Sequence, residues 1–175
     1  MKEKILITVL LLSSLTLFTL SCQKESAQKP QPQEEIATTI GTANNPTFNL
    51  EVILRGEDGR LGHIKFRQDV DPSKIIVLDT WVRDLEPNHQ YLLQRAVDAA
   101  NVVDGDCTST SWLTLGKGLT PQTILTNDNG TGSEELWRDV STVASGTAFD
   151  IHFRIVDATT MVVVLTSDCY QYVVR

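Results

Sequence analysis

Three cysteines and three histidines are the residues of this sequence best suited to covalent or metal chemistry. Cys22 lies where an apolar segment gives way to a polar one, whereas Cys107 and Cys169 lie far downstream. These thiols do not form the Cys-x-x-Cys pairs that are typical of zinc sites. The histidines are scattered, at His63, His89 and His152. The pattern favours cysteine modification and cross-linking over metal binding, and we predict no metal or other cofactor.

The first residues are typical of a secretory signal. Lys2 and Lys4 precede an uncharged, mostly apolar segment at 5–20, which is the order of parts in a signal peptide. The segment is short for a helix that crosses a membrane, since such a helix needs about 20 apolar residues. Ser21, a small residue, directly precedes Cys22.

The Ser21-Cys22 junction resembles the lipobox of bacterial lipoproteins, although Thr19 stands where that family usually has leucine. The resemblance implies that the Cys22 thiol is diacylglycerated, that the chain is cut before it, and that the new amine is acylated. Gln23 takes the place of the aspartate that commonly retains such lipoproteins in the inner membrane. We therefore expect an outer-membrane lipoprotein of the bacterial envelope, held in lipid by its acyl chains and facing the periplasm or the cell surface.

Composition divides the chain into three parts: a signal peptide at 1–21, the lipidated cysteine with a flexible linker at 22–47, and a folded domain at 48–175. The linker is rich in Gln, Lys, Pro, Glu, Ala and Thr and contains few large apolar residues. Such a segment cannot bury enough apolar surface to offset the entropy lost on ordering. We predict that it is disordered and acts as a tether.

The charge balance limits the partners of this protein. Fifteen Lys and Arg residues against twenty-two Asp and Glu residues give a formal net charge of −7. Phosphate backbones require clusters of Lys and Arg, so we do not expect nucleic acid binding. In an exported domain, the two remaining thiols most often pair, and we predict a disulfide between Cys107 and Cys169.

Alternating apolar and polar residues predict a series of short strands. At 48–54 and at 149–156, alternate residues are apolar, which is typical of half-buried strands. Further runs of strand composition are separated by turn residues and lie at 63–67, 75–83, 91–97, 123–126, 134–138, 161–166 and 170–174. We predict an all-β fold, an antiparallel Greek-key β-sandwich of eight or nine strands.

Leu85-x-Pro87-x-x-x-Tyr91 resembles the tyrosine corner of fibronectin type III and related Greek-key sandwiches. The resemblance implies a crossover between sheets that the proline stiffens. It also implies that the ring of Tyr91 lies in the core while its hydroxyl bonds to the backbone upstream.

The order of the corner, the loop Asp104-Gly105-Asp106-Cys107 and the second cysteine also loosely resembles copper/zinc superoxide dismutase-like sandwiches. In that family the strand after the corner carries His-x-His for copper, but this chain has 91–94 as Tyr-Leu-Leu-Gln. Three histidines cannot supply the six imidazoles of the two-metal site. This resemblance therefore implies architecture without dismutase activity.

Trp81 and Trp137 are the strongest candidates for ligand contact, because each lies close to charged or polar residues on a predicted strand. A tryptophan that faces solvent could bind a glycan or a peptide, although most tryptophans fill a core. No Gly-x-Ser-x-Gly elbow and no phosphate-binding loop is present in the sequence.

The sequence thus favours a lipid-anchored, non-enzymatic β-sandwich that acts as a binding or envelope-support module, with no catalytic residues assigned. Its expected partners are membrane lipid, through acylated Cys22, and a glycan, a peptide or an envelope protein. Two alternatives stay open: a metal-binding protein or enzyme whose site cannot be recognised in linear order, and a structural subunit of an envelope complex.

Overall fold

The computed structural model describes residues 47–175. The predicted signal peptide at 1–21, Cys22, and the linker up to residue 46 lie outside the described residues. Over 47–175, the regular structure consists of β-strands and one short 3-10 turn, η1 (Glu57–Gly59). This part of the chain is all-β, as its alternating pattern predicts.

Twelve strands of the described chain join one sheet. In chain order they are β1 (Thr47–Arg55), β2 (Leu61–Asp69), β3 (Ile75–Arg83), β4 (Gln90–Val97), β5 (Leu113–Thr114), β6 (Gly116–Lys117), β7 (Thr120–Pro121), β8 (Thr123–Leu125), β9 (Gly132–Asp139), β10 (Ala148–Asp157), β11 (Val163–Ser167) and β12 (Tyr170–Val173). Nine of them overlap with the predicted strands. The count exceeds the predicted eight or nine because β5, β6 and β7 have two residues each, too few to show an alternating pattern.

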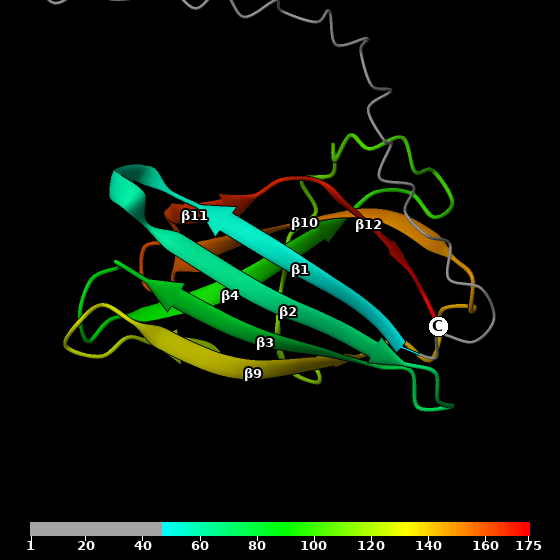
Figure 1. Ribbon diagram of the computed structural model, residues 1–175, viewed down its shortest axis with the longest axis horizontal. Helices are drawn as coiled ribbons and strands as arrows, with labels where there is room; N and C mark the ends of the chain where they lie inside the picture. Colours follow the sequence, from blue (N-terminus) through cyan, green and yellow to red (C-terminus); the bar gives the residue numbers. More distant parts are fainter. Residues whose placement is uncertain (1–46) are drawn as a thin grey trace, which may run out of the picture. The chain divides into compact units, whose positions relative to one another are not determined.

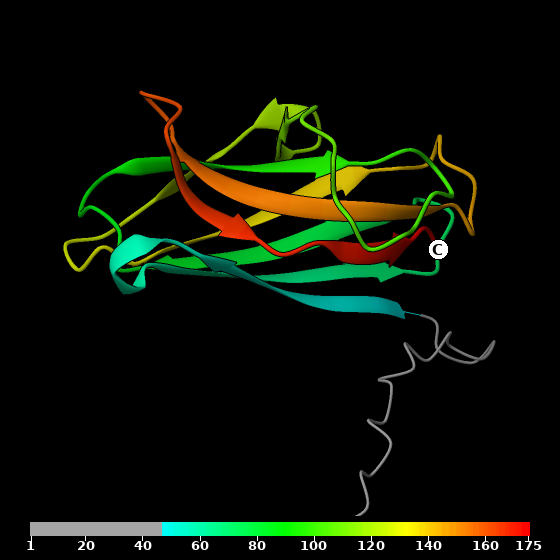
Figure 2. The same ribbon diagram turned by 90° about the horizontal axis from the view of Figure 1, so that it is seen from above.

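The sheet has the order β5-β4-β10-β11-β1-β2-β3-β9-β6-β7, with β12 beside β10 and β8 beside β4. Its pairs are antiparallel except for β6 and β9, which run parallel, so the purely antiparallel prediction does not hold there. The sheet curls into a nearly closed barrel, in which β1, β2 and β3 face β4 and β10 (Figures 1 and 2).

The core lies between these two sides of the sheet. Phe66 on β2 makes edge contacts with Phe153 on β10 and with Tyr172 on β12, at centroid distances of 6.3 and 4.9 Å. Alternate residues of the longer strands are buried, such as Val52 and Leu54 on β1. Period-two burial therefore fixes which side chains enter the barrel and which stay outside.

The two ends of the barrel differ. We call the end at which β3, β8 and β10 finish the closed end, and the end at which β4, β9 and β12 finish the open end. At the closed end, β8 pairs with β4, and the bridge Thr126–Gly132 continues this pairing toward β9. The chain passes over this end between β3 and β4.

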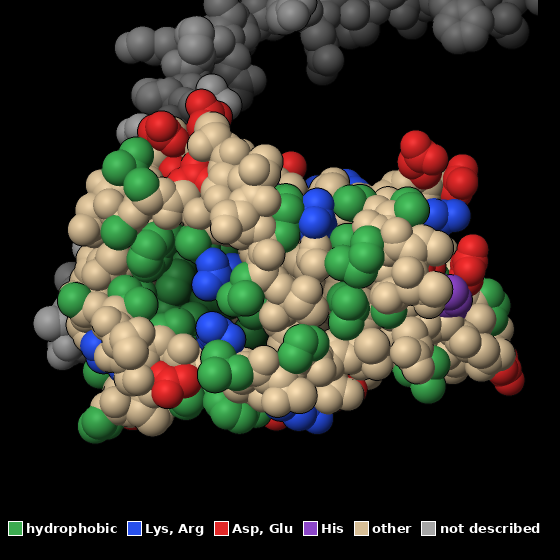
Figure 3. Space-filling model, turned by 180° about the vertical axis from the view of Figure 1, so that it is seen from behind, with side chains coloured by type: hydrophobic (Ala, Val, Ile, Leu, Met, Phe, Trp, Pro, Cys, Tyr) green, Lys and Arg blue, Asp and Glu red, His purple; other side chains and the backbone are tan. Residues whose placement is uncertain are grey.

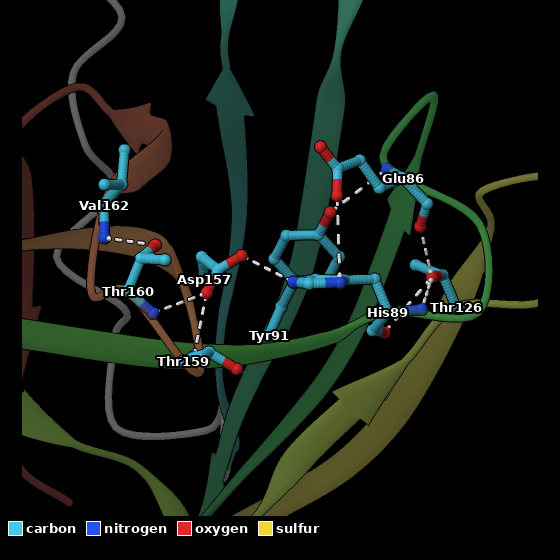
Figure 4. A network of polar contacts seen from close by, with 8 residues as sticks. All are labelled: Glu86, His89, Tyr91, Thr126, Asp157, Thr159, Thr160 and Val162. Carbon is cyan, nitrogen blue, oxygen red and sulfur yellow. Dashed lines mark hydrogen bonds and ion pairs between the residues drawn. The ribbon is translucent and has the colours of Figure 1, made fainter.

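The predicted hydrogen bond of the tyrosine corner forms at the closed end (Figure 4). The amide of Glu86 donates to the hydroxyl of Tyr91 at 3.0 Å, while the Tyr91 ring is buried at 2% exposure. The Leu85 amide donates to the carbonyl of Gly130 at 3.2 Å. Gly130 has a positive φ of 70°, and a Cβ there would clash with the Leu85 carbonyl, so this turn requires glycine.

Cys107 and Cys169 form the predicted disulfide, with their Cα atoms 5.4 Å apart. It joins the loop at 98–112 to the turn between β11 and β12. Asp150, fully buried on β10, also holds this loop, because its carboxylate accepts hydrogen bonds from the amides of Asp104 and Gly105 at 2.8 and 2.9 Å.

Candidate functional site

A gap in the barrel wall begins where the short strands end. β5 pairs with β4 as far as Arg95, and β6 pairs with β9 at Trp137. Between β5 and β6, the amide of Leu115 donates to the carbonyl of Leu93 at 2.8 Å and holds the linking residue against β4. Toward the open end, these registers leave the last residues of β4 and β9 without a strand between them.

An apolar pocket occupies this gap and reaches into the barrel. Its cavity volume is about 80 Å³. Fourteen side chains line it, and twelve of them are apolar or aromatic: Phe66, Ile76, Leu78, Val97, Leu115, Val140, Val143, Phe149, Ile151, Phe153, Tyr172 and Val174. Figure 3 shows this hollow in green, with blue basic groups against its wall.

Arg95 and Arg138 are the two charged residues of the lining. On β4, Arg95 lies between Leu93 and Val97 in the register that faces the barrel interior. Arg138 occupies the same register on β9, between Leu136 and Val140. Both positions would ordinarily hold apolar side chains, because alternate residues of a strand share one face.

The two guanidinium groups influence each other. Burial lowers the pKa of Arg95, and the positive charge of Arg138 lowers it further. Arginine nevertheless stays charged in proteins. Over residues 47–175, no carboxylate forms an ion pair with either group, whereas Arg67 pairs with Asp79 at 2.7 Å.

The nearest acid in register on β9 is already engaged. Glu134 lies two residues before Leu136 on β9 and therefore on the same face of the strand. Its carboxylate contacts Lys117 Nζ at 2.7 Å. Among residues 47–175, the Arg138 side chain makes one hydrogen bond, from Nη1 to the carbonyl of Gly118 at 3.3 Å. Asp139, next to Arg138 in the sequence, has a pKa that the Arg138 charge helps to lower, but it forms no ion pair with it. The pocket therefore presents two positive groups that no carboxylate of residues 47–175 pairs with directly.

The chemistry of the lining suits binding more than catalysis. The fourteen lining residues include no carboxylate, histidine, serine or cysteine, the groups that most often act as nucleophiles or general acids and bases. The Tyr172 hydroxyl donates to Gln68 Oε1 at 2.6 Å, and burial raises the pKa of this phenol above its ordinary value.

The alternating pattern of the sequence predicted the strands that carry these arginines, but the arginines were not predicted as site residues. The signal was present, since Tyr91, Leu93, Arg95 and Val97 share one register of β4. A charged residue that interrupts an apolar register is a site where sequence and fold disagree, and such sites are often functional.

Trp81 and Trp137 lie elsewhere, on the outer face of β3 and β9. They are 43% and 37% exposed, so both reach solvent, as contact with a ligand would require. Trp81 pairs with Ser133, and Trp137 pairs with Val77, which separates the two indoles by four residues along the strands, about 13 Å. Trp81 stacks on His63 at a centroid distance of 5.6 Å.

The three histidines have separate surroundings. His63 contacts Glu51, His89 lies 2.5 Å from Asp157, and His152 contacts the carbonyl of Ser109 at 3.0 Å. No group of three or more His, Cys, Asp or Glu side chains with the geometry of a metal site is found over 47–175.

Within residues 47–175, the structure has no helix with the length and apolar character needed to cross a membrane.

Comparisons with known proteins do not assign a family. No protein-family model, no curated protein and no solved structure matches this chain. The pocket and the outer face of β3 and β9 are therefore the features that can indicate a function.

Proposed function

We propose that this protein is a lipid-anchored binding protein of the bacterial outer membrane, which takes a small molecule with an apolar group into the open-end pocket. In this proposal Cys22 carries the acyl chains, residues 23–46 form the tether, and the β-domain is a non-enzymatic Greek-key sandwich that has curled toward a barrel. The alternating strands and the hydrogen bond of the tyrosine corner support that classification.

The observation that carries the proposal is an apolar pocket that stays open at one end of a well-packed barrel. Ligand pockets typically have volumes of about 300–1,000 Å³ and mostly apolar walls with a few polar groups. The cavity here is about 80 Å³, smaller than that range. Since one water needs about 10–15 Å³, this cavity admits an apolar group of several carbon atoms, and the rest of a ligand would lie in its open mouth.

Small molecules that co-purify with the protein provide the test. The full chain is purified from envelopes into lipid nanodiscs, and organic extracts are compared by mass spectrometry with those of Val143→Trp. Val143 lines the pocket and its neighbour Ala144 is exposed. A compound that is retained by the parent and by Ala144→Trp but lost from Val143→Trp supports the proposal. Equal extracts from all three proteins contradict it.

The exposed tryptophans support a second candidate function, the binding of a neutral glycan on the outer face of β3 and β9. Asp79 and Glu135 pair in register between Trp81 and Trp137. Sugar rings stack on indoles, and carboxylates accept hydrogen bonds from sugar hydroxyls. Binding to a glycan array that Trp81→Ala abolishes and Val143→Trp preserves would favour this function; binding unchanged by Trp81→Ala would exclude it.

A further inference from the structure

We infer that the ligand of the open-end pocket is an anionic amphiphile, whose carboxylate or phosphate group is held jointly by Arg95 and Arg138 while its apolar part enters the barrel. The inference rests on the proposed function and specifies the chemical class of the ligand. It begins from the two residues that break the apolar register of β4 and β9.

The placement of the arginines is unfavourable for the isolated domain. A charge that leaves water loses hydration, and this loss is recovered only where a partner of opposite charge or a full set of hydrogen bonds replaces it. Here the two positive groups lie near each other in an apolar wall, and each disfavours the other. An anion bound between them would remove both costs.

Another half-buried arginine of this domain shows what a structural arginine looks like. Arg154 lies on the opposite face of the β4–β10 pair, where its Nε donates to Gln94 Oε1 at 2.7 Å. Its guanidinium also lies 4.1 Å from the centroid of the Trp112 ring. The chain thus supplies Arg154 with a hydrogen bond and an aromatic face. Over 47–175, by contrast, the side chain of Arg95 has no hydrogen bond or ion pair, and that of Arg138 has only the Gly118 carbonyl at 3.3 Å.

The arrangement selects for a ligand with two chemically different ends. Planar guanidinium groups bind carboxylate and phosphate oxygens through paired, charge-assisted hydrogen bonds. The opposite wall, from β10 and β12, offers Phe149, Phe153 and Tyr172 to an apolar group. Apolar surroundings also strengthen the attraction between the arginines and an anion. A cationic ligand would be repelled, and a neutral one would leave both charges without a partner.

Photoreactive probes of equal length test this inference on the full chain in nanodiscs. Four eight-carbon probes carry a diazirine at the same position and end in a carboxylate, a phosphate, an alcohol or an amine. Labelling of peptides that line the pocket is quantified by mass spectrometry against probe concentration. Arg95→Gln and Arg138→Gln are compared with Arg83→Gln, which removes the same charge from an exposed pair with Asp84 at the closed end.

We expect the carboxylate or phosphate probe to bind the parent about tenfold or more tightly than the alcohol, as charge-assisted hydrogen bonds imply. Either pocket substitution should remove this preference, while Arg83→Gln should keep it. Because each probe is compared between variants in the same lipid, its partition into the nanodisc cancels. Preference for phosphate would point to a phospholipid head group as the source, and preference for carboxylate to a free fatty acid.

Two results overturn the inference, and they are distinguishable from each other. If all four probes label the pocket with equal affinity, or if the amine binds best, the anionic ligand is wrong while the pocket still binds small molecules. If no probe labels the pocket in the parent or in the variants, the proposed function fails as well.

Discussion

The closed and open ends of the barrel use polar residues in opposite ways. At the closed end, polar groups find partners within the chain: Tyr91 accepts from Glu86, and His89 lies 2.5 Å from Asp157 (Figure 4). At the open end, Arg95 and Arg138 line an apolar pocket with no carboxylate partner over residues 47–175. Both ends belong to one sheet, so the difference lies in side chains and short strands rather than in overall architecture.

This comparison separates residues that stabilise the fold from residues that we propose bind a ligand. A buried polar group whose partners lie within the chain contributes to stability, and its removal leaves the partner unsatisfied. A charge placed against an apolar cavity without a partner destabilises the free protein, so its presence is better explained by a ligand. Substitutions at the two ends should therefore change stability in opposite directions.

The largest expected effect concerns the disulfide, which cross-links the sheet that both ends share. Replacing Cys107 and Cys169 by alanine should lower the free energy of unfolding by up to about 4 kcal/mol, because the 62-residue separation restricts the unfolded chain. Urea titrations of the parent and the double variant, both without reductant, measure this. A parent that shows the same midpoint with and without reductant would contradict the prediction.

At the closed end, Tyr91→Phe should lower the free energy of unfolding by about 1–3 kcal/mol, because the Glu86 amide loses its acceptor. Labelling of the open-end pocket by the photoreactive probes should stay at the parent's level. Urea titration and probe labelling of the same sample report both quantities. Loss of labelling without loss of stability would show that the two ends are not independent.

At the open end, Arg95→Met should leave the free energy of unfolding unchanged or raise it by about 1 kcal/mol, since a half-buried charge without an ion-pair partner is replaced by an apolar side chain. Arg67→Met is the control, because it breaks the ion pair with Asp79 and should lower stability by about 0.5–1 kcal/mol. If Arg95→Met destabilises the protein more than Arg67→Met, Arg95 has a structural role that the comparison misses.

The smallest effect is the part of the pH dependence that Asp157 contributes at the closed end; the pKa values of Asp71, Asp98 and Asp139 elsewhere in the domain are lowered as well. Hydrogen bonds from Thr160 and Thr159, together with His89, lower the pKa of Asp157 from 3.8 to about 2, against the opposing effect of burial. Since the folded-state pKa is below the unfolded value, this contribution is present above pH 4 and is lost as the pH falls through 2.

Asp157→Asn should therefore flatten the loss of stability between pH 4 and pH 2, as thermal unfolding at each pH would show. Arg95→Gln should keep the parent's slope over this interval, because arginine does not titrate there. Identical profiles for the parent and Asp157→Asn would mean that the carboxylate contributes nothing at this end.

Much of the fold could be predicted because its signals are local. Alternation predicted the strand at 149–156, and the structure places β10 at Ala148–Asp157. The Leu-x-Pro-x-x-x-Tyr spacing predicted the hydroxyl contact of Tyr91, and the count of thiols predicted the disulfide. The two-residue strands β5, β6 and β7 escaped prediction, because their pairing depends on β4 and β9 rather than on any repeat of their own.

The sequence by itself determined the all-β class, nine of the strands and the cross-link. These follow from the periodicity of apolar residues and from the number of cysteines, which can be read along the chain. Only the tertiary structure decided that Arg95 and Arg138 share one pocket. Their meeting depends on how the sheet curls and where its wall opens. These are long-range features, which the residues next to each arginine in the sequence do not indicate.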